Sequence, residues 1–323
     1  MFATTTLRLA TRSRSTAAAM STARRGLQVL HTVEAVRAVR GATRANGQTL
    51  ALVPTMGALH DGHLALMATA KQHADVVASS IFVNPAQFAP HEDLDQYPRT
   101  LPADVTALTE QGVVSAVFAP TAAEMYPSGI TTNVAEQRGT FVSVAGLSHQ
   151  LEGEIRPHFF RGVATVVAKL LGAVQPDVVV FGQKDAQQCV VVRRMITDLL
   201  LPVTMIVAPT VREADGLAMS SRNRYLSPAE RAVAPALSAG LLAAQTAFEQ
   251  GEKRRDALLA IVDRELRAVD TKGEVKVEYV SIASATDLAE VSGEIGPDGA
   301  IMSAAVRLGS TRLIDNVLLG TTL

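Results

Sequence analysis

The chain has 323 residues, a length that fits two domains of roughly 150 residues each. Its 30 basic and 31 acidic residues give a net charge of −1, and 48% of the residues are apolar, so neither a strongly basic nucleic-acid binder nor an acidic disordered protein is expected. The single cysteine, Cys189, excludes a disulfide framework and a multi-cysteine metal site within one chain.

Residues 1–25 differ from the rest, because they hold five arginines and no acidic residue. Residues 26–323 therefore hold 25 basic and 31 acidic side chains, a net charge of −6. A leader rich in Arg, Ser, Thr and Ala is typical of a mitochondrial or plastid transit peptide. The alternative is an unstructured extension without a targeting function. Met20 would be an internal start that bypasses most of it. We expect an intracellular protein, cytoplasmic or, if the leader is a functional transit peptide, mitochondrial.

Helical and strand patterns alternate from residue 27 to about residue 207. We predict helices over 27–45, 62–72, 101–111, 162–174 and 185–200, and strands over 49–53, 76–83, 113–118, 177–181 and 203–207. This alternation predicts an α/β domain, residues 26–210, with a parallel sheet covered by helices on both faces. Helices over 228–250 and 254–269 and strands over 275–282, 300–307 and 313–318 predict a smaller α+β domain, residues 211–323.

The mean hydropathy of +0.20 is high and raises the question of a membrane segment. A spanning helix needs about 18 or more consecutive apolar residues, and the longest apolar runs, such as 199–209, are interrupted by Thr or Pro. These runs are more typical of buried strands and core helices, so no membrane partner is expected.

Ligand sites in open α/β sheets lie where strands end and helices begin. At the first such junction, His60 and His63 flank Gly62 at the start of a helix. Gly62 lets a phosphate approach the backbone, and the imidazoles and the helix dipole stabilise charge on an α-phosphate during adenylyl transfer. The alternative is two surface histidines at a turn. His-x-Gly-His after a buried strand is typical of nucleotidyltransferases related to class I aminoacyl-tRNA synthetases.

Two further junctions carry polar side chains. Asn84 and Gln87 offer amides that suit a small hydroxylated or carboxylated substrate, and a capped turn is the alternative. In the segment 182–188, glycine permits close approach, Lys184 reaches a phosphate, and Asp185 caps the next helix or accepts from a ribose hydroxyl. Gln188 lies on a neighbouring helix face. A solvated Lys–Asp cap is the alternative here.

The segment 211–223 lies at the predicted domain boundary. Ser220, Ser221 and Arg222 suit the β- and γ-phosphates that leave as pyrophosphate, and Asp215-Gly216 predicts a turn. A polar linker is the alternative. A flexible phosphate-binding loop at this position would also act as a closing lid.

These motifs together resemble the pantoate–β-alanine ligase family. The resemblance covers about residues 27–323 and rests on VPTMGALHxGH at 53–63, FVNPxQF at 82–88, DxYPRT at 95–100, DGLAMSSRN at 215–223 and RLIDN at 312–316. It implies a Rossmann-like domain, a C-terminal lid domain and a homodimer. It also implies ATP-dependent condensation of pantoate with β-alanine through pantoyl adenylate, giving pantothenate, AMP and pyrophosphate, with Mg²⁺ accompanying ATP.

The resemblance also assigns individual residues. His63 matches a proton donor, and His60 and Lys184 complete the expected catalytic group. Asp104 matches a magnesium neighbour, although Ala103 stands where an acidic residue often precedes it. The ATP-binding residues would be Met56, Gly57, His60, Gly62, His63, Gly182, Lys184, Asp185, Val211, Met219, Ser220, Ser221 and Arg222, and the pantoate-binding residues Pro54, Met56, Gln87 and Gln188.

Two departures from the family pattern stand out. Gln183 replaces a frequent Glu, and Phe159 replaces a His, with His158 one position earlier. The role of that His is transferred to neither residue. Arg99 and Arg156 are candidates for the carboxylate of β-alanine. Two alternatives remain at this point: another adenylyltransferase of the superfamily, or a binding subunit without activity, which the retained histidines, Lys184 and Ser-Ser-Arg loop disfavour.

Overall fold

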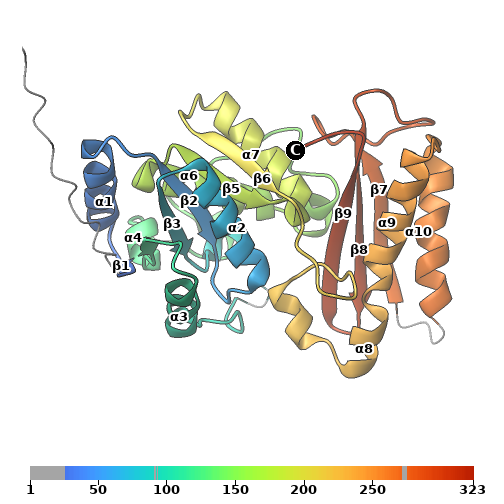
Figure 1. The fold of residues 1–323 in the computed structure, drawn as a ribbon, viewed down its shortest axis with the longest axis horizontal. Helices are drawn as coiled ribbons and strands as arrows, with labels where there is room; N and C mark the ends of the chain where they lie inside the picture. Colours follow the sequence, from blue (N-terminus) through green and yellow to red (C-terminus); the bar gives the residue numbers. More distant parts are fainter. Residues whose placement is uncertain (1–25, 91, 93, 271–274) are drawn as a thin grey trace, which may run out of the picture.

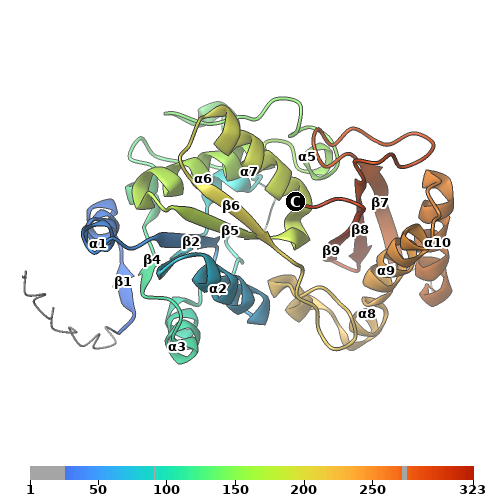
Figure 2. The same cartoon turned by 45° about the horizontal axis from the view of Figure 1, so that its top comes forward.

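The computed structural model describes residues 26–90, 92, 94–270 and 275–323 (Figure 1). The basic leader, and with it the transit-peptide prediction, lies outside the described residues. The described chain forms two parts side by side, a larger α/β part and a smaller part around β7, β8 and β9 (Figures 1 and 2). No helix among the described residues has the length and apolar content needed to cross a membrane.

The larger part is built on a parallel sheet, which confirms the predicted fold class. Its described strands are β1 (Gln28–Leu30), β2 (Leu50–Thr55), β3 (Val76–Ile81), β4 (Ala116–Phe118), β5 (Val178–Gly182) and β6 (Thr204–Ala208). They lie in the order β1-β4-β3-β2-β5-β6, and every pair is parallel. The chain therefore changes direction across the sheet between β2 and β5, the point where open α/β sheets bind ligands.

Helices cover both faces of this sheet. Because strand side chains alternate between faces, Leu52 packs into one core and the adjacent Val53 into the other. The first core includes residues of α1 (Val33–Ala45), α6 (Phe159–Val174) and α7 (Ala186–Asp198); the second includes residues of α2 (Asp61–His73) and α3 (Leu101–Gln111). Short helical segments follow the strands: η1 (Pro85–Gln87), α4 (Ala122–Met125), η2 (Val134–Glu136), α5 (Glu152–Ile155) and η3 (Gln183–Asp185).

The smaller part contains an antiparallel sheet in the order β7-β8-β9. These strands are β7 (Val275–Ala283), β8 (Ala300–Leu308) and β9 (Thr311–Leu319). Helices α9 (Ala236–Glu249) and α10 (Arg255–Val269) pack against the sheet through a shared apolar core. The segments η4 (Ser221–Tyr225) and α8 (Pro228–Val233) connect it to the larger part (Figure 1).

Two predicted helices differ most in extent from the observed ones. The first predicted helix, 27–45, begins only at Val33, because Thr32 caps it by accepting from the amide of Ala35 at 3.2 Å, and the preceding residues form β1. The predicted helix 228–250 is divided into α8 and α9 at Pro235, since proline cannot donate a helical hydrogen bond.

Candidate active site

A cleft of about 1040 Å³ opens beyond the carboxyl ends of β2 and β5. Side chains of β8 and β9 form its opposite wall, so both parts of the molecule line it. The predicted residues that line this cleft are Pro54, Met56, His60, Gly62, His63, Gln87, Gly182, Lys184, Asp185, Gln188, Val211, Met219, Ser220, Ser221 and Arg222. The structure thus brings together segments that are up to 168 positions apart, from residue 54 to residue 222.

His60 and His63 form a compact pair at the start of α2. Their ring centroids are 4.1 Å apart, and the backbone N–H of His60 donates to Nδ1 of His63 at 3.4 Å. A neutral His63 with Nδ1 occupied as an acceptor carries its proton on Nε2. Burial, followed by the neighbouring His60 and Lys184, lowers the pKa of His63 to about 3. Burial and Lys184 also lower the pKa of His60, so both imidazoles are neutral N–H donors at neutral pH.

We expect His63 to contribute to acid destabilisation. The unfolded chain binds a proton at His63 below pH 6.5, whereas the folded chain does so only near pH 3, so stability present above pH 6.5 is lost as the pH falls through this window. At pH 5 the loss attributable to His63 is roughly 1–2 kcal/mol. Urea unfolding at pH 7 and pH 5 should therefore show a smaller loss for His63→Gln than for the wild type. A variant of the exposed His73, His73→Gln, serves as control; equal losses in all three proteins would contradict this assignment.

Cationic side chains face the cleft from two segments. Lys184 follows β5 within η3, and its Nζ lies 3.8 Å from Oδ1 of Asp185. Arg222 lines the cleft within η4, and its guanidinium forms no ion pair among the described residues. Two cations with so little internal compensation suit an anionic ligand such as a triphosphate.

The segment that leads to Ser220 and Arg222 is a tight hairpin. The amide of Met219 donates to the carbonyl of Val211 at 3.0 Å, and Gly216 takes a φ of 91° at the predicted turn. A positive φ of this size is accessible mainly to glycine. The hairpin returns the chain so that Ser220, Ser221 and Arg222 lie beside the end of β6 and face the cleft.

Amide side chains line the other end of the cleft, after β3. Asn84 donates to Oε1 of Gln87 and to the carbonyl of Gly162, both at 3.1 Å, and it accepts from the hydroxyl of Tyr126 at 2.7 Å. Gln87 in turn donates to the sulfur of Met56 at 3.0 Å. A Cβ at position 162 would lie 2.2 Å from the carbonyl oxygen of Ala86, so only glycine lets α6 pack against η1. This packing fixes the direction of Gln87.

Two predicted residues lie beneath the cleft wall. The carboxylate of Asp104, which is 3% exposed, accepts from the amides of Ala58 at 3.1 Å and Leu59 at 2.9 Å and from the hydroxyl of Thr100 at 3.1 Å. Gly57, with a φ of 84°, lets Asp104 approach this turn closely. The contacts make Asp104 a support for the turn that precedes His60, and they do not favour a magnesium neighbour there.

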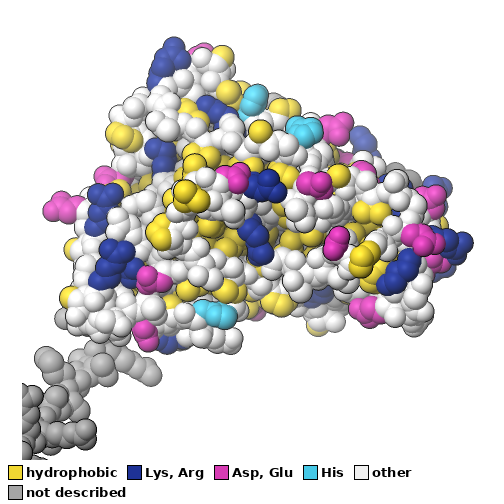
Figure 3. Space-filling model, turned by 90° about the horizontal axis from the view of Figure 1, so that it is seen from above, with side chains coloured by type: hydrophobic (Ala, Val, Ile, Leu, Met, Phe, Trp, Pro, Cys, Tyr) yellow, Lys and Arg dark blue, Asp and Glu magenta, His cyan; other side chains and the backbone are white. Residues whose placement is uncertain are grey.

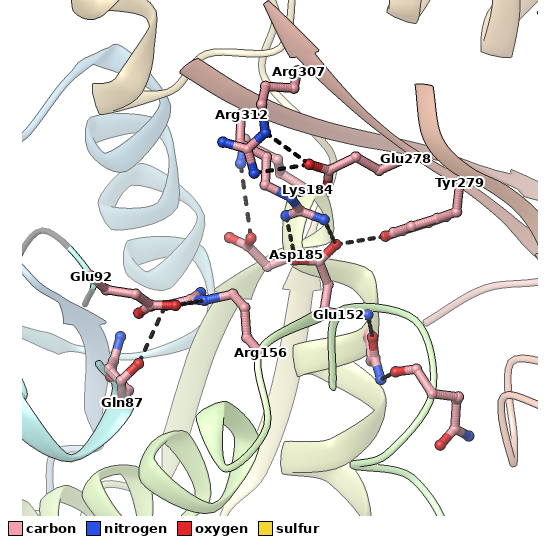
Figure 4. Close-up of polar contacts among 12 residues, drawn as sticks. Gln87, Glu92, Glu152, Arg156, Lys184, Asp185, Glu278, Tyr279, Arg307 and Arg312 are labelled. Atoms are coloured by element: carbon pink, nitrogen blue, oxygen red, sulfur yellow. Dashed lines mark hydrogen bonds and ion pairs between the residues drawn. The ribbon is translucent and has the colours of Figure 1, made fainter. Parts of the chain in front are cut away.

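An ion-pair network lies across the cleft, and the sequence did not predict it (Figure 4). Arg312 on β9 holds both carboxylate oxygens of Glu152 on α5, at 2.6 and 2.7 Å, and it also reaches Glu278 on β7 at 2.6 Å. The hydroxyl of Tyr279 donates to Glu152 at 2.7 Å. Although burial opposes its charge, the two carboxylates raise the pKa of Arg312. This network ties the smaller part to the larger one.

The two arginine candidates differ in their surroundings. Arg156 lines the cleft, where it pairs with Glu92 at 2.7 Å and its guanidinium carbon lies 3.9 Å from the centre of the Phe159 ring. Arg99 is exposed and donates to backbone carbonyls of its own loop. Phe159, at the position where the family often has His, therefore supports Arg156, whereas His158 is exposed.

Charges are mixed on the face of the molecule that is seen from above. In the view from above, Lys and Arg side chains are interspersed with Asp and Glu, without one continuous basic face (Figure 3). Such a surface fits a small anionic ligand held in a cleft better than an extended polyanion.

The parallel sheet, its switch point and the histidine, lysine and serine–arginine segments around one cleft define an α/β enzyme of the nucleotidyltransferase type. The family model for pantoate-beta-alanine ligase matches residues 28–318. The chain belongs to the pantoate–β-alanine ligase family and is an enzyme of that class.

Individual relatives agree with this assignment. The chain is 49% identical to the pantothenate synthetase of Chloroflexus aggregans over 91% of this chain and 100% of that protein, and 50% identical to that of Caulobacter vibrioides over 90% and 98%. Its fold matches the crystal structure of pantothenate synthetase from Thermus thermophilus with a TM-score of 0.80 at 42% identity, covering 91% of this chain and 100% of that chain.

A second solved structure was determined with ligands. Pantoate-beta-alanine ligase from Francisella tularensis, complexed with beta-gamma ATP and β-alanine, matches with a TM-score of 0.70 at 27% identity, covering 92% of this chain and 99% of that chain. These relatives are bacterial, and the family match begins after the leader, so neither finding supports a mitochondrial address.

Proposed function

We propose that the chain condenses pantoate with β-alanine in an ATP-dependent reaction that passes through pantoyl adenylate and gives pantothenate, AMP and pyrophosphate. The observation that carries this proposal is the neutral His60–His63 pair, which faces the same cleft as Lys184 and Arg222. Family membership and the ATP and β-alanine bound to the Francisella tularensis relative support the identity of the substrates.

The first step activates a carboxylate. A carboxylate resists attack by an amine because its leaving group would be oxide, so an oxygen of pantoate first attacks the α-phosphorus of ATP and the bond to pyrophosphate breaks. His63 would donate from Nε2 to an α-phosphate oxygen, and the N-terminus of α2 would stabilise the same charge. Lys184 and Arg222 would receive the departing pyrophosphate.

The second step forms the amide. The free amine of β-alanine attacks the acyl carbon, the carbon–oxygen bond to AMP breaks, and the amine releases a proton. Gln87 and Gln188 would hold the pantoyl group, while Arg156, between Glu92 and Phe159, is the candidate near β-alanine's carboxylate. No side chain becomes a covalent nucleophile; burial raises the pKa of Cys189, which is fully buried in the core.

Magnesium would enter with ATP as part of the substrate. Across residues 26–90, 92, 94–270 and 275–323, no three His, Cys, Asp or Glu side chains gather into a cation cage. The triphosphate and water would therefore supply most of its ligands, as is usual for Mg²⁺. The ion would offset the negative charge of the phosphates. Asp185, beside Lys184, is the carboxylate in the segment expected to bind them.

The family resemblance also supports a homodimer and a lid function for residues 211–323, whose side chains form one wall of the cleft. Closure of such a lid would keep water from the adenylate, which water would otherwise hydrolyse. Sedimentation equilibrium measures the oligomeric state directly: a mass near that of one chain at micromolar concentration would contradict the dimer.

Product formation with single omissions tests the proposed function. We expect AMP release only when ATP, Mg²⁺, pantoate and β-alanine are all present. Nicotinamide mononucleotide or phosphopantetheine in place of pantoate should release no pyrophosphate, which separates this ligase from other adenylyltransferases. ATP binding without AMP release in the complete mixture would contradict the proposal and indicate a binding protein.

A further inference from the structure

Strand β9 contacts both segments that carry the cleft's cations, η3 with Lys184 and η4 with Arg222. Side chains of consecutive strand residues point to opposite faces. Leu313 and Val317 pack into the core of the smaller part, whereas Leu318 packs against the core of the larger part. Asp315 and Asn316 therefore point in opposite directions from one place on β9; each is 2% exposed, and both line the cleft.

Asn316 holds the segment of Lys184. Its side-chain N–H groups donate to the carbonyl oxygens of Gln183 and Lys184, both at 2.9 Å. Its Oδ1 accepts from the side-chain amide of Gln183 at 3.3 Å. Because its two donors are already engaged, Asn316 keeps Oδ1 toward residue 183, and Gln183 supplies a donor that a Glu at this position lacks.

Asp315 holds the segment of Arg222. Its carboxylate accepts from both terminal nitrogens of Arg212, at 2.6 and 3.2 Å, and from the backbone amide of Asn316 at 2.8 Å. Arg212 also donates to the carbonyl of Gly216 at 3.1 Å, within the hairpin that leads to Arg222. This bidentate ion pair between Arg212 and Asp315 sets the position of the hairpin relative to β9.

We infer that Asp315 and Asn316 are positioning residues for the ATP triphosphate: from adjacent sites on β9 they set the distance between Lys184 and Arg222. The inference rests on the proposed assignment of these two cations to phosphates. It explains why two buried polar side chains lie where β9 meets two loops. Asn316 forms hydrogen bonds with the segment that carries Lys184, and Asp315 forms them with Arg212, in the segment that leads to Arg222. Neither residue needs to contact ATP.

The test is direct binding of MgATP to the full chain by titration calorimetry, without pantoate or β-alanine. Asn316→Asp keeps the side-chain size but replaces both donors, and we expect about tenfold weaker ATP binding. In a Lys184→Ala background the same change should cost less than about twofold, because Asn316 acts through Lys184. A purely structural role would give the full loss in both backgrounds. Equal losses, or binding by Asn316→Asp within twofold of the wild type, would overturn the inference.

Two further variants keep the test decisive. Ser281→Ala, at a buried hydroxyl of β7 bonded to Glu290, is the matched control and should bind ATP like the wild type. If Asn316→Asp does not fold, Arg212→Lys retains the charge but loses the two-pronged contact, and binding within twofold of the wild type would then overturn the inference. Wild-type protein that binds ATP but makes no pantothenate would contradict the proposed function and leave this binding test intact.

Discussion

His63→Ala should lower the rate of pantoate-dependent AMP formation by about 10²–10³, equivalent to roughly 3–4 kcal/mol of transition-state stabilisation. The reason is the position of the imidazole at the start of α2, where it is half-buried, neutral and polarised by the backbone N–H of His60. The loss should fall on kcat, because the charge that His63 stabilises develops during transfer to the α-phosphate.

The measurement is initial-rate AMP release with pantoate and β-alanine saturating. His73→Ala, at an exposed position in the last turn of the same helix, is the matched control and should retain the wild-type rate. An unchanged rate of adenylate formation in His63→Ala would remove His63 from the mechanism.

Lys184→Gln should lower kcat/KM for ATP by about 10²–10³, because it removes a cation that would face the departing pyrophosphate. Its Nζ has one weak ionic partner, Asp185 at 3.8 Å, so little internal pairing competes with a phosphate. Lys184→Arg keeps the charge and should recover part of the loss, since guanidinium also binds phosphate.

The same substitution has a second, spectroscopic consequence. Burial is the main cause of the lowered pKa of both His60 and His63, and Lys184 adds to it, so Lys184→Gln should raise both values part of the way toward the ordinary pKa of 6.5. Proton NMR titration of the imidazoles measures this shift, and Lys276→Gln, at an exposed lysine of β7, controls for the general loss of charge. Unchanged kinetics for ATP in Lys184→Gln would contradict the role of Lys184.

Local sequence patterns predicted the parallel sheet because its strands are continuous apolar runs separated by helices. Strand β1 was missed since it is three residues long and is defined by pairing with β4, nearly 90 positions away. The helix α1 begins at Val33, shortly after this strand, so the predicted amphipathic helix was extended backward over β1. Short edge strands depend on partners that periodicity cannot reveal.

Some features of the candidate site could likewise be predicted from the sequence, and others could not. Residues at strand-to-helix junctions were predictable, because all such junctions of a parallel sheet meet at one edge. The pair between Glu152 and Arg312 spans 160 positions and has no local signature, and the function of Asp104 under the turn before His60 depends on its burial. Interactions that join the two parts of the molecule could be found only in three dimensions.

The most direct test of the central claim follows an oxygen atom. If pantoate labelled with ¹⁸O in its carboxylate is converted with ATP and β-alanine, attack on the α-phosphorus transfers one carboxylate oxygen to AMP. Mass spectrometry should then find one ¹⁸O in each AMP and none in pyrophosphate. Unlabelled AMP, or label in pyrophosphate, would contradict a pantoyl adenylate.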